Sequence, residues 1–291
     1  MDAATSFLGF VVIDGIAYGM ILFLISVGLS VTMGLMRFAN LAHGAFAAAG
    51  GAAAISSMQA FGIGFLPALL VGFAAGALIG LILEPALFAP LYGGDELDQV
   101  LMTIGLILVT IATLNLLFGS APLPVVMPDW MQGSIDLGFR NVPNYRAFLI
   151  VSGGLLMLAL WLTLDRTEVG ARIRAAVENP SMAQAVGINT RRLFALTFTF
   201  GCGLAGLGGA MGAPLLPIDP IYPFRYLATF LVVVSIAGFG NIKGTAWVAL
   251  MLGILETAGR YVVPEISGFL IYVVMIVLLL WRPNGLFGRP A

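Results

Sequence analysis

The only histidine of the chain lies in a polar interruption of apolar sequence, at residues 37–44. Ionisable groups within membranes are costly and often functional. His43 is therefore a candidate for a proton relay or for a place on a substrate pathway, although the intramembrane acids Asp14 and Glu256 are far from it in sequence. The alternative is a polar turn at a helix break, which is tolerated where protein or a water-filled cavity covers the backbone. One histidine without further ligands does not make a metal site.

A second interruption, at residues 238–247, resembles the first. In both, an asparagine precedes an ionisable residue and a glycine, and a one-residue gap is needed to align them. Interrupted apolar segments at corresponding places in two halves indicate the substrate site of a transporter built from repeats. The fourth apolar run adds hydroxyl and amide groups, although such groups most often hydrogen-bond between helices. The candidate pathway residues are Asn40, His43, Gly44, Thr103, Asn115 and Asn241.

Glycine-rich stretches in the chain predict helix packing and no nucleotide site. Residues 201–206 match G-x-G-x-x-G, but a dinucleotide site needs a preceding strand in a βαβ unit. These glycines lie within an apolar helical run, and Gly72, Gly76 and Gly80 recur at a helical spacing. No G-x-S-x-G elbow accompanies the single histidine, which argues against a hydrolase. We expect no enzyme activity and no cofactor on this chain.

The amino acid composition indicates which kind of secondary structure must position these residues. The 291 residues are 60% apolar and only 9% charged, against about 25% charged residues in soluble domains. The formal net charge of −1 argues against nucleic acid binding, which needs a basic face. A bilayer core needs about 20 apolar residues per helix. We therefore predict an all-α, polytopic membrane protein, one transmembrane domain over residues 1–291 in contact with lipid, with no soluble domain of its own.

Nine segments are candidate spans, within a range of eight to ten, and three of them, the second, seventh and ninth, suit broken or re-entrant helices. Five arginines between residues 165 and 192 mark that loop as cytoplasmic. This orientation places the C-terminus in the cytoplasm and, with nine spans, the N-terminus outside. The predicted spans are 10–36, 41–60, 64–83, 100–118, 147–164, 193–213, 225–239, 244–263 and 267–281.

The cytoplasmic loop contains signals for a short helix. Asn179 suits a helix N-cap, Pro180 the first helical position and Gly187 the C-terminal stop. Met182, Ala185 and Val186 then share one face of this helix. For residues 168–177 the pattern predicts a helical extension of the fifth span. Because so short a helix is marginal alone, it must dock. It either packs on its own membrane domain or the lipid interface, or fits a socket on a cytoplasmic partner.

Three stretches resemble the membrane-spanning permease subunits of bacterial ATP-binding-cassette importers for branched-chain amino acids. They are the glycine, asparagine and Ala-His-Gly pattern at 34–44, the loop pattern at 170–189, and the ending Pro-Asn-Gly-Leu-Phe-Gly-Arg at 283–289. Their order is that of the family, and the resemblance covers essentially the whole chain. Residues 238–244 depart from it, because relatives more often have Gly-Gly-x-Gly-Ser/Thr-x-x-Gly there.

The resemblance implies a multi-pass protein of the bacterial inner membrane that imports a small polar solute by alternating access. Branched-chain or related amino acids are the expected solutes, with urea, short amides or aromatic acids as alternatives. The implied partners are two cytoplasmic ATPases that bind ATP and Mg²⁺, a second, homologous permease subunit and a periplasmic solute-binding protein. A proton- or ion-coupled secondary transporter is the other reading. The implied coupling-helix residues are Glu178, Asn179, Met182, Ala183, Val186, Gly187 and Ile188.

Overall fold

The computed structural model describes residues 3–36, 38, 40–136, 138 and 141–288. Helices dominate it, as the apolar runs predict. The elements are α1 (Ala3–Met36), α2 (His43–Phe61), α3 (Phe65–Leu83), η1 (Glu84–Phe88), η2 (Ala89–Leu91), α4 (Glu96–Phe118), α5 (Asp129–Gln132), β1 (Ser134–Asp136), β2 (Asn141–Pro143), α6 (Asn144–Arg166), α7 (Glu168–Glu178), α8 (Pro180–Ala185), α9 (Thr190–Gly212), α10 (Tyr222–Arg225), α11 (Leu227–Ala237), α12 (Ile242–Val262) and α13 (Ser267–Trp281).

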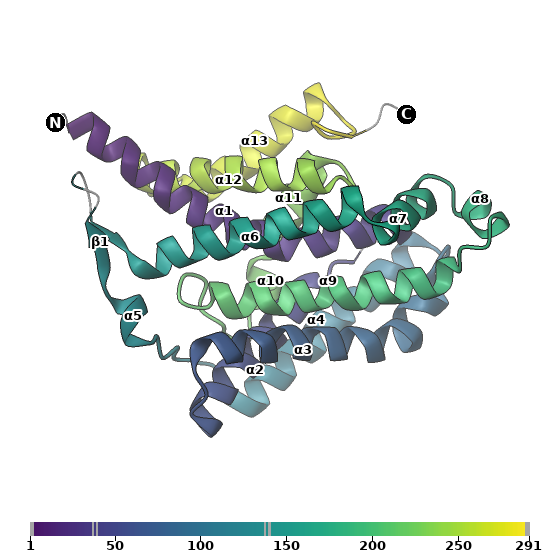
Figure 1. Ribbon diagram of the computed structural model, residues 1–291, viewed down its shortest axis with the longest axis horizontal. Helices are drawn as coiled ribbons and strands as arrows, with labels where there is room; N and C mark the ends of the chain where they lie inside the picture. The colour runs from purple at the N-terminus through teal and green to yellow at the C-terminus, as the bar shows by residue number, and fades with distance from the viewer. Residues whose placement is uncertain (1–2, 37, 39, 137, 139–140, 289–291) are drawn as a thin grey trace.

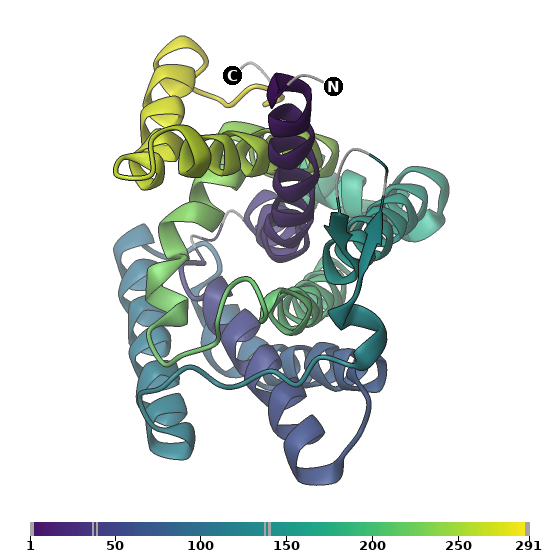
Figure 2. The same cartoon turned by 90° about the vertical axis from the view of Figure 1, so that its left-hand side faces the viewer.

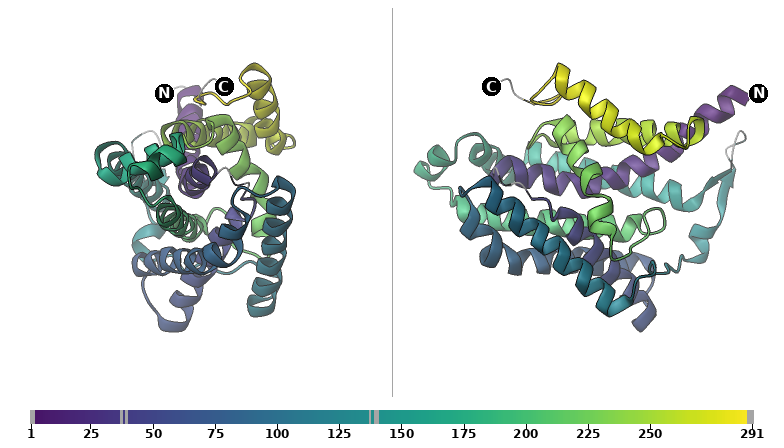
Figure 3. Two further views of the ribbon diagram at one scale, coloured as in Figure 1. Left: turned by 90° about the vertical axis from the view of Figure 1, so that its right-hand side faces the viewer. Right: turned by 180° about the vertical axis from the view of Figure 1, so that it is seen from behind.

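The long helices run roughly side by side along one axis of the molecule (Figure 1). The start of α1, the β1–β2 hairpin and α5 lie at one end (Figure 2), and α7 and α8 project at the other, where α13 also ends (Figure 3). The start of α1 and the end of α13 thus lie toward opposite ends of the bundle. The antiparallel hairpin pairs Ile135 with Val142 and is the one strand element of the described residues.

Nearly all of the nine predicted apolar segments fall in helices, but their lengths differ. Five helices are long and apolar enough to span a membrane: 9–34, 65–91, 96–118, 144–166 and 190–212. α10 and α11 together form an apolar helix over 222–237, and α13 covers 267–281. Both are shorter than the about 20 residues that a bilayer core needs. The sequence was therefore right to single out the seventh and ninth segments as unusual.

Glycines in α9 bring the central helices into backbone contact. A methyl group added at Gly206 would overlap the carbonyl oxygen of Gly72 in α3, and one at Gly50 of α2 would overlap Gly206 itself. Gly28 of α1 meets Gly201 in the same way. Small residues permit such close approach of helices in lipid, where the hydrophobic effect does not drive helices together. The G-x-G-x-x-G match is thus a packing surface.

Burial separates the centre of the bundle from its periphery. In the apolar stretch of α1, 78% of the residues are buried, and 56% in α9, but only 17% in α4 and in α6. α4 and α6 thus present apolar faces outward, to lipid or to another subunit. The helices α1, α2, α3, α9 and α12 make up the packed centre.

We predict that Gly206→Ala destabilises the bundle by about 1–3 kcal/mol, because the added methyl overpacks a backbone contact that cannot give way. The measurement is thermal unfolding of the detergent-purified protein. Gly154→Ala in α6 is the matched control, since no neighbouring atom lies within 4 Å of the methyl it adds. That control keeps or raises stability, because alanine is the better helix former. Equal effects of the two substitutions would contradict the packing account.

Candidate functional site: a projecting helix and a buried break

The loop at residues 165–192 forms the short helix that its capping signals predict. The Asn179 Oδ1 accepts a hydrogen bond from the backbone N–H of Met182 at 3.0 Å. Gly187 has φ of +89°, a left-handed conformation that favours glycine. Beyond it, the Ile188 N–H donates to the Ala183 carbonyl at 2.9 Å and closes the turn. The start and stop of α8 are therefore confirmed.

One small side chain attaches α8 to the rest of the protein. Ala183 is 2% exposed, whereas Met182 and Val186 are 61% and 70% exposed. The Gln184 amide also donates to the Thr190 hydroxyl at 2.7 Å and ties α8 to the start of α9. Within the described part of the chain, the predicted apolar face of α8 remains uncovered. A rigid helix with its apolar tip in water suits contact with another protein.

The prediction that residues 168–177 extend the fifth span is wrong. α6 ends at Arg166, and Thr167 is extended, with φ of −110° and ψ of 160°. The Thr167 hydroxyl accepts from the Gly170 N–H at 3.3 Å and so caps a new helix, α7. Gly170 then packs directly against the backbone of Leu164, a contact that any larger residue would block. Threonine and glycine at these positions turn the chain back onto the end of α6.

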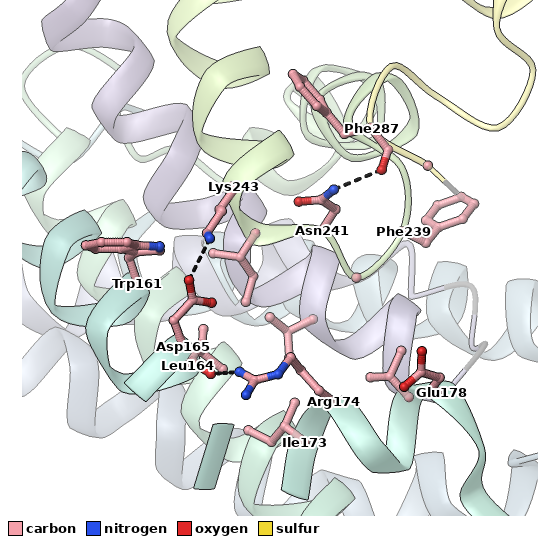
Figure 4. A pocket seen from close by; sticks show the side chains of 15 residues that line it. Trp161, Leu164, Asp165, Ile173, Arg174, Glu178, Phe239, Asn241, Lys243 and Phe287 are labelled. Atoms are coloured by element: carbon pink, nitrogen blue, oxygen red, sulfur yellow. Dashed lines mark hydrogen bonds and ion pairs between the residues drawn. The ribbon is translucent and has the colours of Figure 1, made fainter. Parts of the chain in front are cut away.

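A pocket of about 680 Å³ lies between α7, the ends of α1 and α6, and the start of α12 (Figure 4). Its charged groups come from three helices. The Lys243 ammonium pairs with the Asp165 carboxylate at 2.6 Å and lies 5.5 Å from the centroid of the Trp161 ring. The Arg174 guanidinium donates to the Leu164 carbonyl. These contacts link the end of α6 to both α7 and the start of α12.

The second interruption anchors the C-terminal segment. The Asn241 Oδ1 caps α12 by accepting from the Gly244 N–H, and its Nδ2 donates to the Phe287 carbonyl, both at 2.9 Å. The Leu286 N–H donates to the Ile236 carbonyl at 2.7 Å. Asn241 therefore has a structural role at the end of the bundle where α7 and α8 lie. A role of Asn241 in the pathway stays a prediction.

The first interruption lies deep in the bundle. Asn40 and His43 are each 1% exposed. Ala42 and Ala45, on either side of His43, pack with Ile107, which is halfway along α4. α2 therefore begins at the middle of the bundle, as a broken segment does. A methyl group at Gly44 would lie 3.2 Å from the carbonyl oxygen of Pro223 in α10, so two helix starts meet here.

Aromatic rings fill the space between this break and η1. The ring centroids of Phe38 and Phe88 are 5.3 Å apart, and those of Phe88 and Phe198 are 4.5 Å apart. The Tyr92 hydroxyl donates to Glu84 at 3.0 Å. Burial and the nearby Glu84 carboxylate raise the pKa of Tyr92, so its hydroxyl stays protonated and keeps this bond. The cluster closes the bundle between the break and the end that bears α7.

The polar residues of α4 have partners within or next to their own helix. Thr103 is buried, and its hydroxyl donates to the Gln99 carbonyl at 2.9 Å. Asn115 is exposed near the other end of α4 and accepts from the Ser120 hydroxyl at 3.0 Å. Along α4, Thr103 precedes and Asn115 follows Ile107, the residue that packs beside the break. The two residues therefore lie on opposite sides of the level of His43. Their place in the pathway stays a prediction.

Sequence reasoning missed the partners of the buried acids. Asp14 pairs with Arg146 and also accepts from the Tyr261 hydroxyl at 3.0 Å, while Glu256 pairs with Arg260. The i,i+4 spacing of Glu256 and Arg260 was a readable signal. The pair of Asp14 and Arg146 joins α1 to α6 and has no local pattern. Both acids are therefore neutralised by arginines.

Comparisons with known proteins agree with this architecture. The chain is 27% identical to the high-affinity branched-chain amino acid transport system permease protein LivH of Escherichia coli (strain K12), over 95% of this chain and 94% of LivH. It is 26% identical to the permease protein LivM of the same system and strain, over 92% of this chain and 68% of LivM. The fold resembles PsaBC from Streptococcus pneumoniae in complex with Fab, with a TM-score of 0.51 and 12% identity, covering 92% of this chain and 89% of that one.

The family match covers most of the chain. The family described as branched-chain amino acid transport system / permease component matches residues 11–279. This range runs from α1 to α13 and includes both interruptions and the short helix α8. The chain belongs to the family of permease components of branched-chain amino acid transport systems.

Proposed function

We propose that this chain is one permease subunit of an ATP-driven importer that carries branched-chain amino acids across the bacterial inner membrane. ATP is hydrolysed on two separate cytoplasmic ATPases, which bind the nucleotide and Mg²⁺. The observation that carries the proposal is α8, which projects from one end of the bundle with Met182 and Val186 exposed. This chain contains no nucleotide-binding loop of its own.

The partners follow from the same arrangement. Similarity to both LivH and LivM supports a pair of sister permeases, and the outward apolar faces of α4 and α6 provide area for a second subunit or for lipid. A solute-binding protein docks at the opposite end, near α5 and the β1–β2 hairpin. Phe287 and Gly288, at the end of the described chain, line the pocket beside α7, so this end of the chain belongs on the cytoplasmic side.

A contiguous set of contacts connects α8 to the buried break. α8 follows α7 directly, and α7 places Val177 against Gly240, 3.8 Å from where a methyl group at Gly240 would lie. Gly240 contacts Gly34 near the end of α1, and its N–H donates to the Ser30 carbonyl at 3.0 Å. Asn40 follows the last residue of α1, Met36, by four positions. Movement of α8 by the ATPases therefore acts on the break by way of α7, the second interruption and α1.

We predict that Met182→Glu or Val186→Glu uncouples transport while the protein stays folded, because each places a charge at an apolar contact with an ATPase. The measurement is solute uptake together with ATP hydrolysis in proteoliposomes that contain the whole complex. Val169→Glu, an exposed apolar position in α7 outside the 178–188 segment, is the control and keeps uptake close to that of the wild type. Ala183 is unsuitable as a test, since it is buried within this chain.

Normal uptake by both the Met182 and the Val186 variants, in complexes that contain the ATPases, contradicts the assignment of α8 as the coupling helix.

We also predict that uptake depends on ATP and on the ATPase subunits and does not depend on a proton gradient. The physical reason is that Asp14 and Glu256 already pair with Arg146 and Arg260, so neither is a free proton carrier. The measurement is uptake with ATP held constant, with and without a protonophore. Loss of uptake on adding the protonophore, or uptake without any ATPase, supports the secondary transporter instead.

A further inference from the structure

The start of α2 combines two features that rarely occur together in a membrane protein. The first is a helix N-terminus in the middle of the bundle, at His43. The N-cap residue there is Ala42, whose side chain makes no capping bond. The first N–H groups of a helix and its dipole favour a negative charge. In broken membrane helices, such ends point at anionic groups of the substrate.

The second feature is a pair of polar side chains without partners. Among the residues that the structure describes, no atom makes a hydrogen bond with the amide of Asn40 or with either ring nitrogen of His43. The backbone of Ile25 faces the imidazole but not at hydrogen-bonding geometry. Both residues are 1% exposed. Buried polar groups are nearly always satisfied, so this pair needs an explanation.

The surroundings have the character of an amino acid site. Leu41, Ile107, Ile111 and Leu227 form an apolar wall with Ala42 and Ala45 beside the break. The amide of Asn40 and the imidazole of His43 each offer a donor and an acceptor. A branched apolar side chain fits the wall, and the charged end of the same molecule fits the helix start.

Resting on the proposed function, we propose that the N-terminus of α2, with Asn40 and His43, binds the α-carboxylate of the amino acid in transit. The site is closed in this structure, since Gly44 lies against Pro223 and the alanines lie against Ile107. Separation of α2 from α4 or from α10 opens it. The unpartnered groups are then satisfied by the substrate during one part of the cycle.

The decisive variant is His43→Leu, because a structural role and a substrate role predict opposite results. Loss of an unpartnered buried polar group stabilises the fold. We expect an unchanged or raised unfolding midpoint, ATP hydrolysis still stimulated by the leucine-loaded binding protein, and leucine uptake lowered about tenfold to a hundredfold. His43→Gln, which keeps a donor and an acceptor, retains most of the uptake. All measurements use the complete complex in proteoliposomes.

Thr199→Val in α9 is the matched control. Like His43→Leu, it removes a buried polar group that has no hydrogen-bond partner within the described chain. This group, the Thr199 hydroxyl, belongs to a residue that contacts α3 near Gly80. Its uptake equals that of the wild type. Wild-type uptake by His43→Leu overturns the proposal, and so does a lowered midpoint, which marks His43 as structural. If the wild-type complex shows no stimulated ATP hydrolysis, the proposed function itself fails.

A second experiment tests the charge that the site selects. Asn40→Asp adds a negative charge at nearly constant shape, which repels a carboxylate. Equilibrium binding of labelled leucine to the purified complex is competed with unlabelled leucine or with leucinamide, which lacks the carboxylate. We expect wild-type binding to prefer leucine at least about tenfold and the variant to lose that preference. Equal competition in the wild type, or no saturable binding, overturns the proposal.

Discussion

The architecture depends on backbone contact between α9 and the helices around it. Gly201 and Gly206 allow α1, α2 and α3 to approach α9 without intervening side chains. In lipid this contact supplies the packing that the hydrophobic effect supplies in water. α2 packs on α9 through the contact of Gly50 with Gly206, and it begins in the middle of the bundle, where Ala42 and Ala45 pack with Ile107. The same packed centre therefore surrounds the buried break at Asn40–His43.

A rigid centre also fits the proposal that an ATPase bound to α8 acts on the buried break at Asn40–His43. α7 and α8 make few contacts with the packed centre, and those contacts lie at the ends of α1 and α9 and at the second interruption. The pair of Asp165 and Lys243 and the bond from Asn241 to Phe287 cross-link these ends. In the proposed mechanism, movement of α8 reaches the bundle through these chain ends and caps, while the glycine contacts hold the central helices together.

Sequence patterns predicted the local features well. The caps at Asn179 and Gly187, the packing role of the α9 glycines and the unusual seventh and ninth spans all follow from short-range rules. The fold-back at Thr167 was missed, because the close contact of Gly170 with Leu164 that fixes it, together with the Thr167 cap, is clear only in the structure. The pairing of Asp14 with Arg146 and the depth of His43 depend on how distant helices pack, which no local pattern contains.

The central claim is that a separate ATPase drives transport by this chain through contact with α8. The chain has one cysteine, Cys202, which is fully buried, so an added surface cysteine is the one reactive thiol. A thiol-to-amine cross-linker on Val186→Cys in the whole complex should join this chain to an ATPase subunit, and Ile135→Cys in the hairpin at the opposite end should not. Cross-linking from Ile135→Cys and none from Val186→Cys would contradict the account.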